Sequence, residues 1–262
     1  MAGLKRKAVT MEAESTSTSP YIPVFEQFRS ELDEHHDRRE RTIKASRDIT
    51  AQSKKIIFAL QRTRELGKPI HGSITKQTKG MYDTIKERFE SIVPDLQGIN
   101  ANRYQYNISG GIQEYMEAIL FQHYLETQKL MTHAEAASTL PEGIKLTQSD
   151  YLLGIFDMTG ELMRFSITYM ATNGKLPGGD SLEQSVLADM QALRGYLEGL
   201  NAAGNRDLKD FDNKLRVTKQ SVEKVENSVY SMLVRGKERP KGWRPDAGPA
   251  DGRRDVEEIE SY

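Results

Sequence analysis

The chain has 262 residues, enough for one large helical domain or two small ones. Its 37 basic and 38 acidic side chains nearly cancel, so the overall charge gives no support for nucleic-acid binding, which would need a local basic surface. The absence of cysteine excludes disulfides, thiolate metal sites and cysteine nucleophiles. Residues 1–20 lack the apolar core of a secretory signal, and no apolar run reaches the length of a membrane span, so we expect no membrane partner.

The long segments between the prolines carry helical periodicity, and none shows sustained strand-type alternation. The sequence therefore predicts an all-α fold of about six or seven helices. These form a single domain at residues 21–236, between disordered tails at 1–20 and 237–262. In chain order the predicted helices are 24–66, 75–93, 111–130, a short one from Thr132, one from Ser149 or Asp150 to Asn173–Gly174, one from Asp180 or Ser181 to Asn201, and 207–234.

Two of these helices carry acidic residues on otherwise apolar surfaces. In the segment 151–170, apolar side chains cover nearly the whole circumference, and the polar remainder is a narrow seam with Asp157, Glu161 and Arg164. Asp157 and Glu161 are four residues apart, so their carboxylates face the same way, one turn apart. Gly154 and Gly160 lower the stability of this helix, and we interpret them as leaving room for an approach to the seam.

The segment 111–130 repeats this pattern. Glu114 and Glu117 are three residues apart, on a face that continues with Phe121 and Tyr124. Ionised carboxylates in an apolar setting cost free energy unless they are protonated, paired with cations or bound to metal. Oxygen-only ligands suit Mg²⁺ or Mn²⁺, and two such ions activate water and stabilise the leaving oxygen when a phosphodiester is hydrolysed. These four acids therefore form a candidate metal site.

Two alternatives to a catalytic metal site follow from the residues alone. Acid pairs at this spacing arise by chance in a chain that is 29% charged, and Arg164 is placed to neutralise Asp157 or Glu161 in a structural ion pair. On these grounds alone the structural interpretation is modestly favoured. A di-iron site as in ferritin-like bundles would need Glu-x-x-His, and neither Glu117 nor Glu161 has a histidine three residues on.

Three blocks of sequence carry a family resemblance: SRDIT with SKKIIF at 46–58, QEYMEA with FQH at 113–123, and DYLLG with DMTGELMR at 150–164. On these blocks the chain resembles the translin-associated factor X members of the translin family over about residues 21–236. The resemblance implies an all-α subunit that assembles with translin into a hollow hetero-octameric barrel. It also implies a Mg²⁺-dependent endoribonuclease of the cytoplasm and nucleus that acts on single-stranded or nicked RNA. Members of the family are linked to passenger-strand removal in RNA interference and to trimming of precursor-tRNA fragments.

The family's catalytic acids fall on Glu114, Glu117 and Asp157, with Glu161 as the fourth member of the cluster. The resemblance thus assigns these four residues both catalysis and the binding of Mg²⁺, with Mn²⁺ as a substitute. All four positions are acidic here, so the resemblance places the catalytic interpretation ahead of the structural one. The remaining alternative is a non-catalytic helical adaptor that stabilises translin and binds nucleic acid.

The first predicted helix offers a candidate RNA-binding surface. Four basic residues fall within one narrow stripe, away from the apolar face of that helix: Arg41, Lys44, Lys55 and Arg62. Cations at this spacing contact successive phosphates without reading bases, and an ordinary solvated helix face is the alternative. Lys5, Arg6 and Lys7 resemble a nuclear localisation signal, although three basic residues in a polar tail usually carry no function.

Overall fold

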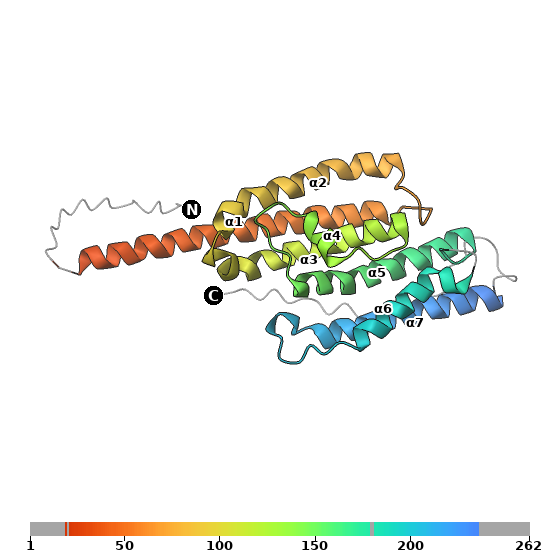
Figure 1. The fold of residues 1–262 in the computed structure, drawn as a ribbon. Coiled ribbons are helices and arrows are strands. Elements are labelled where there is room, and N and C mark those ends of the chain that lie inside the picture. The colour runs from red at the N-terminus through yellow and green to blue at the C-terminus, as the bar shows by residue number, and fades with distance from the viewer. Residues whose placement is uncertain (1–18, 20, 179–180, 236–262) are drawn as a thin grey trace, which may run out of the picture. The chain divides into compact units, whose positions relative to one another are not determined.

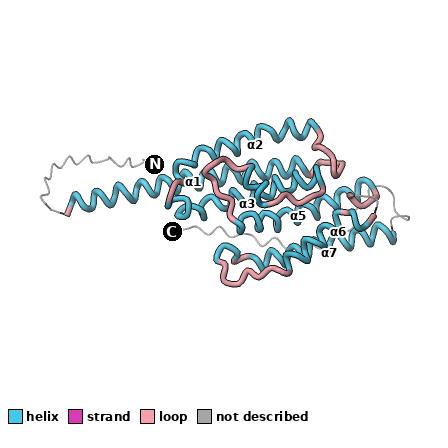
Figure 2. Tube along the Cα trace, in the orientation of Figure 1, coloured by secondary structure: helices cyan, strands magenta, loops and turns pink. Residues whose placement is uncertain are grey.

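A computed structural model describes Ser19 and residues 21–178 and 181–235 of the chain. Within these residues it contains seven α-helices and no strand, as Figure 2 shows, which confirms the predicted all-α class. The predicted tails and the Lys5–Lys7 cluster fall almost wholly outside the described residues. No described helix combines the length and hydropathy needed to cross a bilayer.

The chain divides into two compact units, residues 1–40 and 41–262, and the boundary falls within α1 (Ile22–Leu60). In the first unit, the rings of Phe25 and Phe28 pack edge to face at 6.3 Å between centroids. The sequence predicted that this helix would continue to residue 66, which is wrong. The chain turns after Leu60 because tertiary contacts hold it there: the Gly67 amide donates to the Leu125 carbonyl at 2.8 Å.

The remaining helices follow in the second unit, which Figure 1 shows as α2 to α7. Short 3₁₀ turns η1, η2 and η3 connect some of them. Their bounds are α2 Gly72–Ile92, η1 Val93–Leu96, α3 Ile99–Thr127, α4 His133–Ser138, α5 Gln148–Asn173, η2 Leu182–Gln184, α6 Val186–Glu198, η3 Arg206–Leu208 and α7 Phe211–Arg235.

Local capping chemistry explains several of these boundaries. Thr132 caps α4 through a complete capping box with Glu135, as its position in the sequence indicates. Gly174 ends α5 in the left-handed conformation that favours glycine. The N-cap of α5 is Thr147, whose hydroxyl accepts from the Asp150 amide at 3.0 Å, so the predicted start at Ser149 or Asp150 was a few residues late.

Helix α3 begins at Ile99, although the sequence predicted a start at residue 111 after the glycine pair. The helix continues through Gly111 because this residue lies against α1. A Cβ built there would come within 3.0 Å of the backbone of Ser46, and the Gly111 amide donates to the Ser46 hydroxyl at 3.0 Å. A glycine that sequence reasoning took for a helix start is a point of close packing between helices.

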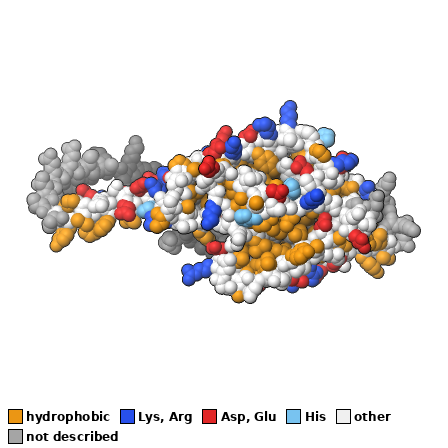
Figure 3. Space-filling model, viewed as in Figure 1, with side chains coloured by type: hydrophobic (Ala, Val, Ile, Leu, Met, Phe, Trp, Pro, Cys, Tyr) orange, Lys and Arg blue, Asp and Glu red, His pale blue; other side chains and the backbone are white. Residues whose placement is uncertain are grey.

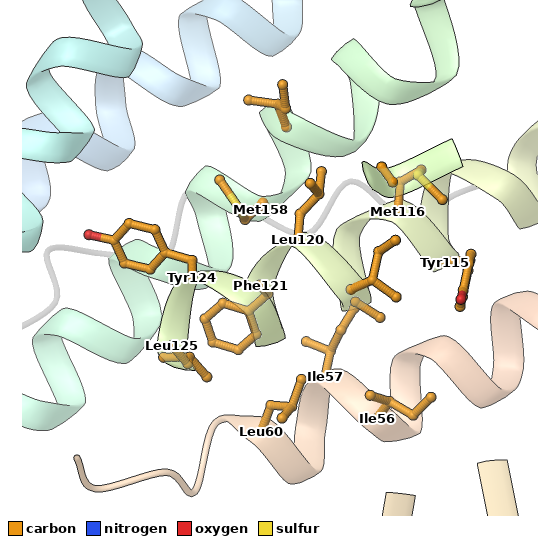
Figure 4. Close-up of a cluster of buried hydrophobic side chains, with 14 of the residues drawn as sticks. Ile56, Ile57, Leu60, Tyr115, Met116, Leu120, Phe121, Tyr124, Leu125 and Met158 are labelled. Carbon is orange, nitrogen blue, oxygen red and sulfur yellow. The ribbon is translucent and has the colours of Figure 1, made fainter. Parts of the chain in front are cut away.

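The core of the second unit lies where α1, α3 and α5 meet. Figure 4 shows Ile57 and Leu60 of α1 directed toward Phe121 of α3, with Met158 of α5 on the other side of α3. Helix α3 packs along α5, and α5 packs along α7. A smaller cluster of Leu153, Phe156, Leu197 and Phe211 joins α5 to α6 and α7. Figure 3 shows further hydrophobic side chains gathered over α5 on the face in view.

Candidate active site

The four predicted acids lie on the two helices whose packing is most extensive, Glu114 and Glu117 on α3 and Asp157 and Glu161 on α5. Glu117 is partly buried, and burial raises the pKa of its carboxyl to about 8. The negative charges of Asp157, Glu114 and Glu161 add to this pKa rise, in that order, whereas Lys214 opposes it. All three acids act on Glu117, so the structure brings the four predicted residues into one cluster.

A close approach between α3 and α5 places Glu117 in this cluster. A Cβ on Gly154 of α5 would lie 2.6 Å from the Cβ of Met116 and 3.4 Å from the Glu117 backbone nitrogen. The room at Gly154 is therefore taken by α3, and its interpretation as an approach for a ligand was wrong. Gly160 has no neighbour within 4 Å of its Cβ position, and it does leave open space beside the acidic seam.

Three of the four acids have a cationic partner of their own. Glu114 forms an ion pair with the Lys54 ammonium of α1 at 3.2 Å, and Asp157 accepts a hydrogen bond from Lys214 of α7 at 2.5 Å. Arg164 lies one turn from Glu161 on α5, and its guanidinium is 3.3 Å from that carboxylate. The sequence named Arg164 as a neutralising partner of Asp157 or Glu161, and the structure assigns it to Glu161.

Glu161 is the most buried of the four and has a second polar partner. Its side chain is only 12% exposed, and Gln61 donates to its carboxylate at 2.7 Å and to its backbone carbonyl at 2.9 Å. Gln61 follows directly after α1, so this pair of hydrogen bonds ties the end of α1 to α5.

Glu117 differs from the other three acids. Among the residues that the structure describes, it has neither an ion-pair partner nor a hydrogen-bond donor. The cluster thus holds four carboxylates and three nearby cations, and the acid without a cation is the one whose pKa is raised to about 8.

The donor chemistry of this cluster fits a divalent cation. Carboxylate oxygens are the ligands that Mg²⁺ and Mn²⁺ prefer, and an added cation would lower the cost of ionising Glu117. As the side chains stand in the described part of the chain, no three acidic or histidine residues converge at metal-ligand spacing. Ligation by Glu114, Asp157 and Glu161 would therefore require their carboxylates to turn away from Lys54, Lys214 and Arg164.

Sequence reasoning missed the partners Lys54, Gln61 and Lys214. They come from α1, from the residue after it and from α7, up to 100 residues from the acids they contact, as in the case of Gln61 and Glu161. These partners could be found only from information on which distant segments of the chain lie together. Helical periodicity describes one segment at a time and carries no such information. Lys54 does belong to a block on which the family resemblance rests.

The four predicted RNA-binding residues lie on or near α1 in different environments. Arg41 makes a bidentate ion pair with Asp95, at 2.8 and 2.7 Å, so its guanidinium already contacts an anion of the same chain. Arg62 contacts the Gln77 side chain and the Ala59 carbonyl. Lys44 and Lys55 are exposed, and among the described residues neither is paired with an acid.

Asp48, which interrupts the basic stripe in the sequence, pairs with Arg88 of α2 at 3.0 Å. Two tyrosines near the start of α3 differ in exposure, since Tyr104 is buried and Tyr106 is 88% exposed.

These features define an all-α protein with an acidic cluster at a close contact between two core helices. The chain belongs to the translin family, whose model matches residues 37–236. It is 32% identical to translin-associated protein X of Rattus norvegicus over 87% of this chain and 83% of the rat protein. It is 34% identical to the translin-associated protein X homolog of Schizosaccharomyces pombe, over 80% of this chain and 87% of the yeast protein.

Among solved structures, the AfC3PO–duplex RNA complex resembles this chain with a TM-score of 0.60 at 20% identity, covering 82% of this chain and 99% of that chain. Apo-NeC3PO resembles it with a TM-score of 0.56 at 18% identity, covering 82% and 99%. At these identities the likeness shows that the folds agree. The family membership and translin-like fold expected from the three sequence blocks are both confirmed.

Proposed function

We propose that this chain is the catalytic subunit of a metal-dependent endoribonuclease that works in a complex with translin. The observation that carries the proposal is Glu117, which is surrounded by three other carboxylates and has no cation of its own. Such an arrangement costs free energy in the metal-free protein, and function is a reason to retain it. The names of the relatives support the partner, since they describe proteins associated with translin.

The chemistry assigned to the site is hydrolysis of a phosphodiester. A bound Mg²⁺, or Mn²⁺ in its place, would neutralise the phosphodiester oxygens as a Lewis acid. Glu114, Asp157 and Glu161 supply carboxylate oxygens to hold the ion. Glu117, in its ionised form, takes a proton from the attacking water as the water oxygen bonds to phosphorus. The phosphorus–oxygen ester bond then breaks, and the leaving oxygen takes a proton from solvent.

The proposed substrate is single-stranded or nicked RNA, held through its phosphates. All four members of the predicted basic stripe are exposed, and Lys44 and Lys55 have no acidic partner among the described residues. AfC3PO, a solved protein of similar fold, forms a complex with duplex RNA, which supports RNA as the ligand class. We further propose the hetero-octameric barrel with translin, a place in the cytoplasm and nucleus, and roles in passenger-strand removal and precursor-tRNA trimming.

Cleavage of single-stranded RNA by the chain co-purified with translin tests this proposal, in Mg²⁺ and in EDTA. We expect Asp157→Asn and Glu117→Gln each to lower the Mg²⁺-dependent rate by about a hundredfold or more. Glu87→Gln is the matched control and should leave the rate unchanged, because Glu87 is an exposed acid on α2, outside the cluster. Full activity in both cluster variants would refute the catalytic assignment.

A non-catalytic helical adaptor is the second candidate, and one observation favours it. Three of the four acids are paired with Lys54, Lys214 and Arg164, as structural ion pairs would be. The adaptor predicts the same melting temperature with and without Mg²⁺. The nuclease predicts that Mg²⁺ raises the melting temperature of the wild type and not that of Asp157→Asn.

A further inference from the structure

One aromatic side chain of α1 is turned to solvent beside the core. Phe58 is 74% exposed, although Ile56, Ile57 and Leu60 around it in the sequence are buried. Figure 4 shows Ile57 and Leu60 on the side of α1 that faces α3, and Ile56 belongs to the same core cluster. A single exposed apolar side chain is common on protein surfaces, so the surroundings of Phe58 decide whether it has a role.

Phe58 lies between the two contacts that connect this end of α1 with the acidic cluster. Lys54 is four residues before it and Gln61 three residues after it, so all three share one helical face. Lys54 contacts Glu114 of α3, and Gln61 contacts Glu161 of α5. The ring of Phe58 therefore stands at the rim of the cluster formed by Glu114, Glu117, Asp157 and Glu161.

Basic side chains also flank Phe58 at this rim. Lys54 and Lys55 lie one turn before Phe58 and Arg62 one turn after it, and all three are exposed. An exposed ring among cations matches the surface that binds single-stranded nucleic acid, where bases stack on aromatic rings and phosphates contact the basic groups. The core of a protein–protein interface is instead depleted of lysine. The charge around Phe58 thus favours RNA over a protein partner.

We propose that Phe58 is a stacking platform for an unpaired base of the RNA whose phosphodiester lies at the acidic cluster. The inference rests on the proposed function and adds a requirement to it. Stacking on one exposed ring needs a base that is free of a complementary strand, and every base offers an equivalent face. The site therefore selects unpaired nucleotides with little preference for sequence.

The test measures binding in EDTA, where cleavage plays no part. The probe is a single-stranded RNA oligonucleotide with one 2-aminopurine, mixed with the full-length chain co-purified with translin. We expect Phe58→Leu to weaken binding by about tenfold, since this loses one stacked base. We also expect it to abolish the quenching of 2-aminopurine fluorescence. Phe58→Trp should restore both, because it replaces the ring with another aromatic surface.

The matched control is Tyr196→Leu on α6. Tyr196 is 78% exposed, and no lysine or arginine stands three or four residues from it. This variant should bind and quench as the wild type does. Wild-type binding and quenching by Phe58→Leu would overturn the proposal. Loss of translin from the Phe58→Leu complex would also overturn it, since this face would then belong to a protein interface.

The test of the stacking platform can fail or succeed independently of the test of the nuclease. If the complex binds and quenches RNA through Phe58 but never cleaves it, stacking stands and the nuclease proposal fails. If the complex cleaves RNA while Phe58→Leu binds and quenches normally, the nuclease stands and the stacking platform fails.

Discussion

Asp150 and Glu117 are acidic residues of the same helix pair, α5 and α3, and their surroundings are opposite. Asp150 is almost fully buried and accepts from four neutral side chains. Glu117 is less buried, faces three other carboxylates and has no donor among the described residues. An acid whose carboxylate accepts hydrogen bonds from its neighbours is a structural element. An acid without such donors marks a place where another cation or a proton belongs.

The hydrogen bonds of Asp150 also fix how the two helices lie. Gln113 donates to its carboxylate at 2.9 Å and Gln105 at 3.2 Å, both from α3, and Ser109 of α3 donates as well. Thr147 donates from the start of α5 at 2.7 Å. This network holds α3 against α5 two turns from the acidic cluster. The structural acid thus maintains the arrangement that the functional acid needs.

Removing the structural acid gives the largest expected effect on stability. Asp150→Ala leaves four donors without their acceptor, and we expect the free energy of unfolding to fall by about 3 kcal/mol. Urea denaturation of the full-length chain measures this. Glu87→Ala, at an exposed position on α2, should change it by less than about 0.5 kcal/mol. If Asp150→Ala lowers the free energy of unfolding by less than about 1 kcal/mol, Asp150 is not a structural acid and does not differ from Glu117 in this way.

The close helix contact beside Glu117 can be broken directly. Gly154→Ala places a methyl group 2.6 Å from the Met116 Cβ, and we expect it to lower the free energy of unfolding by about 2 kcal/mol through overpacking. Gly160→Ala on the same helix meets open space and should instead raise it by about 0.5–1 kcal/mol. Equal effects at the two positions would show that the contact with α3 carries no strain.

The third prediction concerns pH. Because the pKa of Glu117 rises from its ordinary value of 4.5 to about 8 on folding, the folded state holds this proton more tightly than the unfolded state. Without divalent metal, the Glu117 carboxyl should therefore cause the free energy of unfolding to fall as the pH rises from 5 to 8. Glu117→Gln should remove that decline and exceed the wild type by about 1–2 kcal/mol at pH 8. Urea denaturation in EDTA measures the free energy of unfolding of both proteins as a function of pH. Parallel curves for the wild type and Glu117→Gln would contradict this prediction.

The smallest effect is expected at the rim of the cluster. The side chain of Lys54 is 64% exposed, so its ion pair with Glu114 is well hydrated. Lys54→Gln should change the free energy of unfolding by less than about 0.5 kcal/mol in the same denaturation experiment. A loss above about 1 kcal/mol would mean that the cations of the cluster are structural, and would favour the adaptor over the nuclease.

The sequence predicted those features that depend on local spacing. The pairs Glu114/Glu117 and Asp157/Glu161 follow from helical periodicity, and the ends of two helices follow from the capping chemistry of Thr132 and Gly174. That the two pairs converge followed from the family resemblance and from the apolar surroundings of both pairs. Electrostatic coupling to Glu117 is the structural observation that agrees with it.

Features that depend on packing between distant segments were beyond sequence reasoning. Gly111 and Gly154 were interpreted as a helix start and as space for a ligand, and both are contacts between helices. The partners Lys54 and Lys214 could not be assigned because nothing in one segment indicates which distant helix covers it. A glycine within an amphipathic helix has the same sequence signal whether it faces solvent, a ligand or another backbone.

The position of Lys214 on α7 has a consequence for how the protein is made. Asp157 is synthesised well before its cation, since 57 residues separate them. A nascent chain that has reached α6 therefore carries Asp157 without its cation, and the smaller apolar cluster around Phe156 is still open. The acids reach their final electrostatic environment only when the last helix has left the ribosome and docked.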